Sequence, residues 1–230
     1  MKTFTKHLLT AVLTLVSAAT ILTAQTREVG TFSALSTSGS VEVKLEKADS
    51  PSVSYKMLRG DSDDLITKVK GDVLQVYIKQ SWGIKKNAKA KVIVYYTELN
   101  DISASAGSSL VNEGVIESNN LEIDCSSGAS AKLEIDAHNA EIGASSGASL
   151  RVSGRAGSAE LDASSGASVS AADLVAKHVE AEASSGASVS CHATDSIEAE
   201  ASSGGSVSYE GNPDKKEISK NRSGSVSRRG

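Results

Sequence analysis

The sequence is short of several residue types, and each shortage excludes a class of protein. Aromatic residues make up 3% of the 230 residues, and there are only two prolines and two cysteines. Two cysteines cannot form a disulfide scaffold, and so few prolines exclude collagen and proline-rich linkers. The formal net charge of −4 argues against a dedicated nucleic-acid-binding protein. Because 39% of the residues are apolar and few are aromatic, the core must consist of thin layers of Val, Ile, Leu and Ala.

The first 24 residues have the composition of a secretory signal peptide. Lys2 and Lys6 form a basic start, the stretch from Leu8 to Leu22 is mostly apolar, and the small residue Ala24 precedes the expected cleavage point. A membrane anchor is the alternative, but an apolar run of about 15 residues is shorter than the ~20 that a spanning helix needs. No later segment is long and apolar enough to span a bilayer as a helix. We therefore expect an exported protein, in the periplasm, on the outer-membrane surface or secreted, without a transmembrane segment after cleavage.

The second half of the chain contains an internal repeat, Ser-Ser-Gly-Ala-Ser, with weaker copies at both ends. Its glycines recur every 18–21 residues. They are Gly107, Gly128, Gly147, Gly166, Gly186, Gly204 and Gly224. On both sides of each glycine, apolar and polar residues alternate, as in Leu121, Ile123 and Cys125. This period of two predicts strands with one buried face.

These observations predict an all-β protein, a right-handed parallel β-helix of about seven coils with ~20 residues each. Glycine suits the corner between two strands because it tolerates a positive φ angle. An antiparallel sandwich or barrel is the alternative fold, but it does not call for a turn of fixed sequence. The repetition of nearly the same sequence at every corner of this chain favours the solenoid.

The domain organisation follows from where the repeat begins. Residues 25–98 have strand-like alternation without the strict repeat, as in Val41, Val43 and Leu45, and Ser38-Gly39-Ser40 resembles a corner. We expect this segment to be continuous with the helix formed by residues 99–230 and to cap its first coil. Lysines and arginines near the C-terminus are expected to protect the opposite end from edge pairing.

Three features together resemble a known family. They are the start at Val29-Gly30-Thr31-Phe32-Ser33, the repeated Ser-Ser-Gly-Ala-Ser corners, and the closing segment from Val207 to Pro213. The chain is similar in these respects to the family described as putative auto-transporter adhesin, head GIN domain, over residues 28–227. The resemblance implies an exported bacterial β-helical protein with an adhesin-like role, and it brings no catalytic residues with it.

The main candidate site is a double row of acidic residues placed six and four residues before each corner glycine. Alternation with inward apolar residues predicts that these acids face solvent and stack about 4.8 Å apart. The candidate acidic binding face comprises Asp101, Glu122, Asp124, Glu141, Glu160, Asp162, Glu180, Glu182, Glu198 and Glu200. Stacked like charges are destabilising unless raised pKa values, ions or a cationic partner offset them. Bound Ca²⁺ and a basic partner are the functional interpretations, and a solvated face without a ligand is the alternative.

Two further surfaces are candidate binding sites. Stacked corner serines predict a row of hydroxyl groups, which suits a sugar or ice surface or simply a tight turn. These serines are Ser127, Ser146, Ser165, Ser185 and Ser203. Five lysines between Lys79 and Lys91 surround Trp82, the one tryptophan, and suggest either an anionic contact or a flexible hairpin.

Enzymatic interpretations have less support in the sequence. The acidic rows contain many equivalent carboxylates and no distinguished pair of the kind that glycoside hydrolysis needs. Cys125 and Cys191 fall on different strands about three coils apart, so we expect two buried free thiols and no disulfide. We expect a non-enzymatic, adhesin-like or structural module of a bacterial envelope, without a cofactor unless Ca²⁺ binds. Its partner would be a surface ligand, a glycan or an envelope protein, and the alternative function is a polysaccharide lyase or pectinase-like enzyme.

Overall fold

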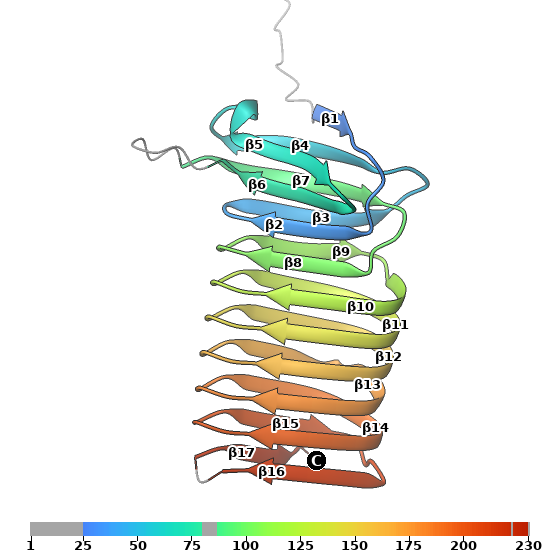
Figure 1. The fold of residues 1–230 in the computed structure, drawn as a ribbon, viewed down its shortest axis with the longest axis vertical. Coiled ribbons are helices and arrows are strands. Elements are labelled where there is room, and N and C mark those ends of the chain that lie inside the picture. Colours follow the sequence, from blue (N-terminus) through green and yellow to red (C-terminus); the bar gives the residue numbers. More distant parts are fainter. Residues whose placement is uncertain (1–24, 80–86, 222, 230) are drawn as a thin grey trace, which may run out of the picture.

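The computed structural model describes residues 25–79, 87–221 and 223–229 and consists almost entirely of β-strands (Figure 1). The one helical element in these ranges is a 3-10 turn at Ser62–Asp64. The strands are β1 (Gln25–Glu28), β2 (Ala34–Ser38), β3 (Val41–Lys47), β4 (Ser52–Arg59), β5 (Leu65–Lys70), β6 (Val73–Ile78), β7 (Lys89–Tyr96), β8 (Asp101–Ser105), β9 (Ser109–Glu113), β10 (Ile116–Cys125), β11 (Ser130–Ala144), β12 (Ser149–Ala163), β13 (Ser168–Ala183), β14 (Ser188–Ala201), β15 (Ser206–Glu210), β16 (Lys215–Lys220) and β17 (Ser225–Arg228).

The strands form a parallel β-solenoid of about seven turns, as the repeat predicts. Strands β10 to β14 each pair in parallel with the equivalent strand of the next coil, so residues at equivalent repeat positions lie side by side. Figure 1 shows the coils stacked along one axis with their corners aligned at one edge. Strands β11 to β14 run from one corner to the next, and each bends once on the way.

Each repeated corner is a four-residue turn with two central residues in the left-handed region. In the corner of residues 126–129, Ser127 has φ 52° and Gly128 has φ 70°, and the Ala129 amide donates to the Ser126 carbonyl at 3.0 Å. Two positive φ angles and this hydrogen bond are typical of a type I′ turn. The positive φ of glycine was predicted. That of the preceding serine was not, because a non-glycine residue seldom adopts it.

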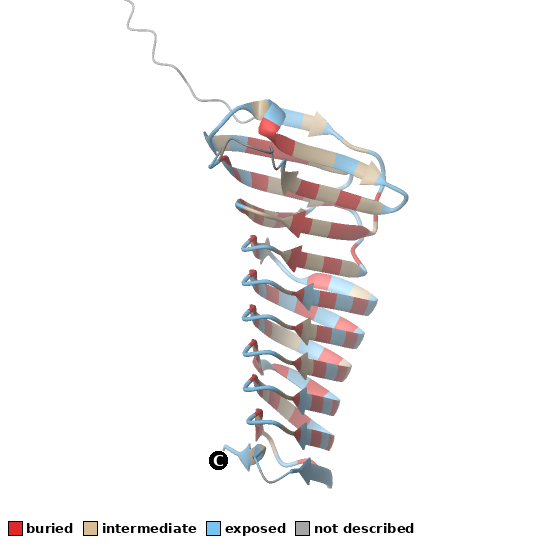
Figure 2. Ribbon diagram, turned by 60° about the vertical axis from the view of Figure 1, so that its left-hand side comes forward, coloured by how far each residue is buried: buried red, intermediate tan, exposed pale blue. Residues whose placement is uncertain are grey.

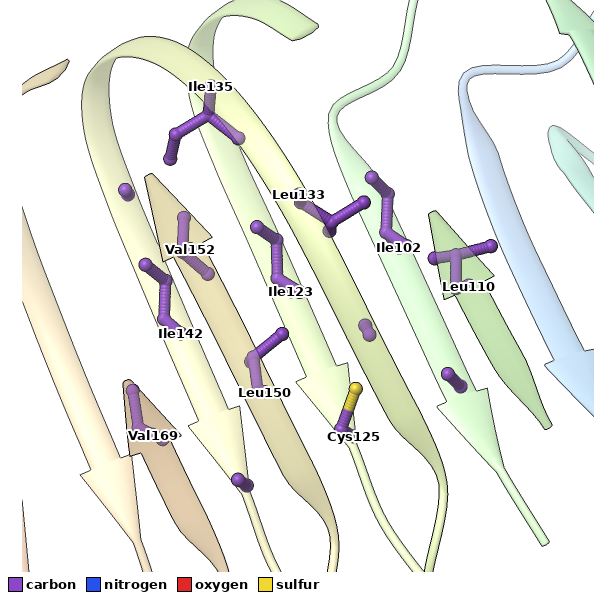
Figure 3. Packing of buried hydrophobic residues seen from close by; sticks show 14 of the residues in the cluster. Ile102, Leu110, Ile123, Cys125, Leu133, Ile135, Ile142, Leu150, Val152 and Val169 are labelled. Carbon is purple, nitrogen blue, oxygen red and sulfur yellow. The ribbon is translucent and has the colours of Figure 1, made fainter. Parts of the chain in front are cut away.

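The core column is one continuous cluster of apolar, mainly aliphatic residues along the axis. Figure 2 shows buried and exposed residues alternating along the strands, and Figure 3 shows side chains from successive coils packed against one another. Ile123, Ile142 and Leu161 are in register from coil to coil and at most 1% exposed. Each coil therefore covers its apolar face with the coils above and below, which is the stabilising arrangement of a solenoid.

The N-terminal segment both contributes coils and covers the end of the stack. Strands β2 and β3 join at Gly39, whose φ is 80°, and they pair in parallel with β8 and β9 on one side. On the other side they pair in parallel with β6 and β7, so this coil lies between segments that follow it in the chain. Strands β4 and β5 then add antiparallel to β7 and β6, and β1 adds antiparallel to β4. Because antiparallel strands do not continue the coil, they act as the expected cap.

Arg27 fastens the first strand to this cap. Its guanidinium donates to the carbonyls of Leu65 and Ser62, at 3.0 and 3.1 Å, and to the side chains of Thr67 and Tyr55, at 3.0 and 2.9 Å. It also lies 4.3 Å from the centre of the Tyr55 ring, within the range of a cation–π interaction. One side chain thus connects β1, β4, β5 and the 3-10 turn.

The last corner is shifted by one residue from the position that the repeat glycines predict, in which Gly224 would match the glycine of each earlier corner. Ser225 is in register with Ser206, and the Gly224 amide donates to the Asn221 carbonyl at 3.1 Å, as Ala129 does to Ser126 in an earlier corner. Gly224 therefore occupies the alanine position of the turn, and Ser223 occupies the glycine position. The alignment on Gly224 was wrong because the side chain of Asn221 supports this turn, accepting from the Ser223 and Gly224 amides.

Candidate functional site

The first row of predicted acids forms a continuous column along the outside of the solenoid. Pairing registers align each acid with the acid of the next coil, from β8 to β16. The column is Asp101, Glu122, Glu141, Glu160, Glu180, Glu198 and Glu217. The sequence pattern did not predict Glu217, because counting six residues back from Gly224 gives Ile218 instead. Equivalent residues of neighbouring parallel strands lie about 4.8 Å apart, so seven carboxylates follow one line.

The second row is a column of four acids with one gap. It consists of Asp124, Asp162, Glu182 and Glu200, with Gly143 between the first two. The carboxylate of Asp124 lies over Gly143, in the space that a side chain at that position would need. The glycine therefore makes room for a neighbouring carboxylate, which explains why the pattern is interrupted in this coil.

A third column, beside the first, was not recognised from the sequence. Its residues lie eight positions before each corner glycine, or before Ser223 in the last corner. They are Asn120, Asn139, Ser158, His178, Ser196 and Lys215. The Asn139 amide donates to the Asn120 side-chain oxygen at 2.8 Å, and the Ser158 hydroxyl donates to that of Asn139 at 2.8 Å. Nδ1 of His178 lies 2.9 Å from the Ser196 hydroxyl. The signal was a constant polar character at this repeat position, although the residue type changes.

The first acidic column and this polar column enclose an open groove of about 880 Å³ that follows the solenoid axis. Its floor includes residues of the core column, among them Leu121, Ala159 and Ile197, and Lys215 and Glu217 lie at its C-terminal end. The groove thus has carboxylates on one side and amide, hydroxyl and imidazole groups on the other. Such a surface favours ligands that carry positive charge and hydrogen-bond donors.

Five carboxylates of the two columns have a raised pKa. Partial burial raises the pKa of Asp101, Glu122, Glu160, Asp162 and Glu182, and the negative charge of neighbouring carboxylates raises it further. Within the described ranges no salt bridge involves an acid of either column. For these five carboxylates burial is the larger cause of the raised pKa, and repulsion from neighbouring carboxylates adds to it.

Three acids near the N-terminal coils, Glu42, Glu113 and Glu117, have a lowered pKa instead. Lys47 binds Glu117 at 2.7 Å, and Lys44 binds Glu113. These hydrogen bonds hold the pKa of Glu113 and of Glu117 below the usual value. Glu113 and Glu117 are thus paired with lysines, whereas no acid of the two columns has a cationic partner among the described residues.

The spacing of the columns does not create a compact metal site. In the part of the chain that the structure describes, no three His, Cys, Asp or Glu side chains converge in a way that could hold a metal ion. One acid per column and coil gives a line of carboxylates, whereas Ca²⁺ requires six to eight oxygen ligands around one point. The interpretation that Ca²⁺ binds here stays a prediction.

The remaining predicted features are placed as follows. The corner serines at positions 127, 146, 165, 185 and 203 are exposed. Cys125 and Cys191 are buried and unpaired, and burial raises the pKa of each thiol to about 12. Residues 80–86, with Trp82, and the predicted signal peptide 1–24 lie outside the described residues. No helix among the described residues is long and apolar enough to cross a membrane.

Solved structures share this fold over most of the chain. A structure described as a putative adhesin from Bacteroides fragilis has a TM-score of 0.81 at 20% sequence identity, and the match covers 90% of this chain and 96% of that chain. A putative lipid binding protein from Parabacteroides distasonis gives 0.70 at 20% identity, with the same coverage of both chains. A putative adhesin from Parabacteroides merdae gives 0.69 at 15% identity, again with this coverage. At these identities the likeness establishes the fold alone.

The sequence itself identifies the family. No curated protein matches the chain significantly. The family model described as putative auto-transporter adhesin, head GIN domain, matches residues 31–213. This range lies within the resemblance expected for residues 28–227 and includes the repeated corners, the N-terminal coils and most of the groove. The chain therefore belongs to the head GIN domain family of putative auto-transporter adhesins.

Proposed function

We propose that this protein is an exported, non-enzymatic binding module of the bacterial cell envelope, and that its groove binds an extended cationic ligand. The observation that carries the proposal is the column of seven carboxylates in register along the groove. A flexible ligand with regularly spaced amino groups, such as a basic polypeptide segment, would contact several coils at once. The adhesin description of the family agrees with a binding role.

The electrostatics support a cationic ligand in particular. The carboxylates have no cationic partner among the described residues, and burial and mutual repulsion raise the pKa of five of them. A bound cation would relieve this repulsion in addition to forming its own contacts. Binding is then expected to weaken as salt rises, because exposed charges are screened within about 8 Å at physiological ionic strength.

The uniformity of the columns disfavours the alternative of a carbohydrate-active enzyme. Glycoside hydrolysis needs one carboxyl group that is protonated and a second that is ionised, in unequal surroundings. Here the pKa is raised for Asp101, Glu122 and Glu160 of the first column and for Asp162 and Glu182 of the second, rather than for one pair. Lys215, at one end, is the cationic side chain of the groove lining.

The proposal is tested by titrating the protein with oligolysine at low salt and measuring affinity by calorimetry. The test variant combines Glu141→Gln, Glu160→Gln and Glu180→Gln, which neutralises the middle of the column. We expect its affinity to fall about tenfold, corresponding to about 0.5 kcal/mol for each exposed ion pair. Oligoglutamate should not compete with oligolysine for the groove.

A matched control combines Glu134→Gln, Asp136→Asn and Glu210→Gln, which changes the net charge equally outside the groove lining. If both triple variants lose the same affinity, the attraction is a matter of net charge and the groove is not the site. Thermal unfolding with Ca²⁺ and with a chelator adds a second arm. A rise in midpoint with Ca²⁺ that the groove variant abolishes would assign the columns to a metal ion instead of a cationic polymer.

A further inference from the structure

The last coil presents charged side chains where the other coils bury apolar ones. Lys216 is in register with the buried Ile197, Lys220 with Ala201, and Arg228 with Tyr209. These positions face the axis of the solenoid in every preceding coil. In the last coil no further strand of the described residues covers them, and all three side chains are exposed. The C-terminal end of the core is therefore surrounded by cations.

An apolar surface remains between these cations. Ile218 is in register with the buried Ala199 and is 47% exposed, and Val226 is only partly buried. Among the described residues, β16 pairs with β14 and β17 pairs with β15, and no paired strand is found on the opposite edge of either. Figure 1 shows these two strands at the end of the stack, opposite the antiparallel cap. An open edge with unpaired backbone groups is a template for a further strand.

The positions of these side chains specify what such a strand must contain. Lys216, Ile218 and Lys220 alternate along β16 and point to the same side, so an incoming strand meets a cation, an apolar residue and a cation in turn. We propose that the C-terminal edge of the solenoid accepts an extended acidic segment of a partner protein, with the pattern acid–x–apolar–x–acid. The segment would add to β16 as the next coil, so that backbone hydrogen bonds supply affinity and the acids supply selectivity. This site is separate from the groove and does not depend on the ligand proposed there.

The same side chains disfavour a second copy of this chain as the occupant. End-to-end contact of two C-terminal coils would bring Lys216 and Lys220 of each copy close to those of the other. Like charges that face one another across a strand pair are destabilising, and inward-pointing charges are a known protection against edge-to-edge association. Charge complementarity therefore selects an acidic partner strand over self-association.

The test measures binding of a fluorescently labelled peptide, Thr-Glu-Thr-Ile-Thr-Glu-Thr, by anisotropy with the unmodified protein. The pattern reads the same in both directions, so it suits parallel and antiparallel addition alike. We expect saturable binding, and about fivefold weaker binding of the neutral peptide Thr-Gln-Thr-Ile-Thr-Gln-Thr, because two attractive cross-strand pairs are lost. The variant Lys216→Glu with Lys220→Glu should reverse this preference.

The matched control is Lys215→Glu, which changes the charge of the same strand at an outward position, in register with Ser196. It should leave the ratio of the two affinities nearly unchanged. Equal affinity for both peptides, or a preference that Lys215→Glu alters as strongly as Lys216→Glu, would overturn the proposal. So would a concentration-dependent dimer of the unmodified protein that the acidic peptide dissociates, since the edge would then belong to a second copy.

Discussion

Neutralising one carboxylate in the middle of the acidic column should stabilise the protein. Glu160 is in register with Glu141 on one side and Glu180 on the other. Two unit charges 4.8 Å apart repel by about 0.9 kcal/mol in water, and screening at physiological salt reduces this to about 0.5 kcal/mol. Glu160→Gln removes two such pairs and keeps the shape of the side chain. The free energy of unfolding should therefore rise by about 1 kcal/mol, and the melting temperature by about 2–4 °C.

The double variant Glu160→Gln with Glu180→Gln gives a sharper check of the same reasoning. Each single change removes two neighbouring pairs, but the two residues share one pair, so the double change removes three pairs instead of four. The gains should fall short of additivity by about 0.5 kcal/mol, the energy of one pair. Thermal or urea unfolding of the four proteins in the cycle measures this difference.

The stabilisation by Glu160→Gln should increase with pH. Burial and neighbouring carboxylates raise the pKa of Glu160, so the folded state binds its proton more tightly than the unfolded state. A raised carboxyl pKa contributes stability that is present at low pH and is lost as pH rises through the folded pKa. The advantage of Glu160→Gln should therefore be full at pH 7 and should disappear below about pH 4, near the ordinary carboxyl pKa.

Glu134, on the same solenoid but outside the acidic columns, provides a control for Glu160→Gln. Glu134→Gln removes an acid whose partner in the next coil is the neutral Ser153, and it should change stability by less than about 0.5 kcal/mol. If Glu160→Gln destabilises the protein at pH 7, or if its advantage persists in molar salt, repulsion along the column does not dominate at this site. The groove carboxylates would then be stabilised by contacts that the column spacing does not reveal.

Three other expectations can be measured independently. Ser165 has φ 53° in its corner, so Ser165→Val should cost about 1–2 kcal/mol in unfolding free energy, whereas Ser165→Gly should cost little or be favourable. Arg27→Ala should accelerate amide hydrogen exchange in β1 and β5 and leave exchange in β12 unchanged, since only the cap loses its hydrogen bonds. Cys125 and Cys191 should react with a thiol reagent at pH 8 only at the rate of unfolding, because burial raises the pKa of both to about 12; rapid labelling of the folded protein would contradict their burial.

Much of the candidate site was predictable because a parallel solenoid repeats its environment in every coil. Glu122, Glu141 and Glu160 occupy one repeat position, so a count from each corner glycine is enough to place them in one column. The alternating inward residues were predictable for the same reason. The prediction failed for Glu217, where the corner uses Ser223 in place of glycine and the count starts from the wrong residue.

The sequence by itself determined the coil, its corners, its core and the two acidic columns, since these depend on local alternation and on a turn that recurs at a fixed spacing. Only the tertiary structure decided how the N-terminal end of the stack is closed. It places the β2–β3 coil between β6–β7 and β8–β9, and it sets the antiparallel strands β1, β4 and β5 over the exposed end. It also sets the polar column beside the acidic one to make a groove. These features depend on pairing between distant segments, which is governed by the need to cover the open end of the core rather than by any local pattern.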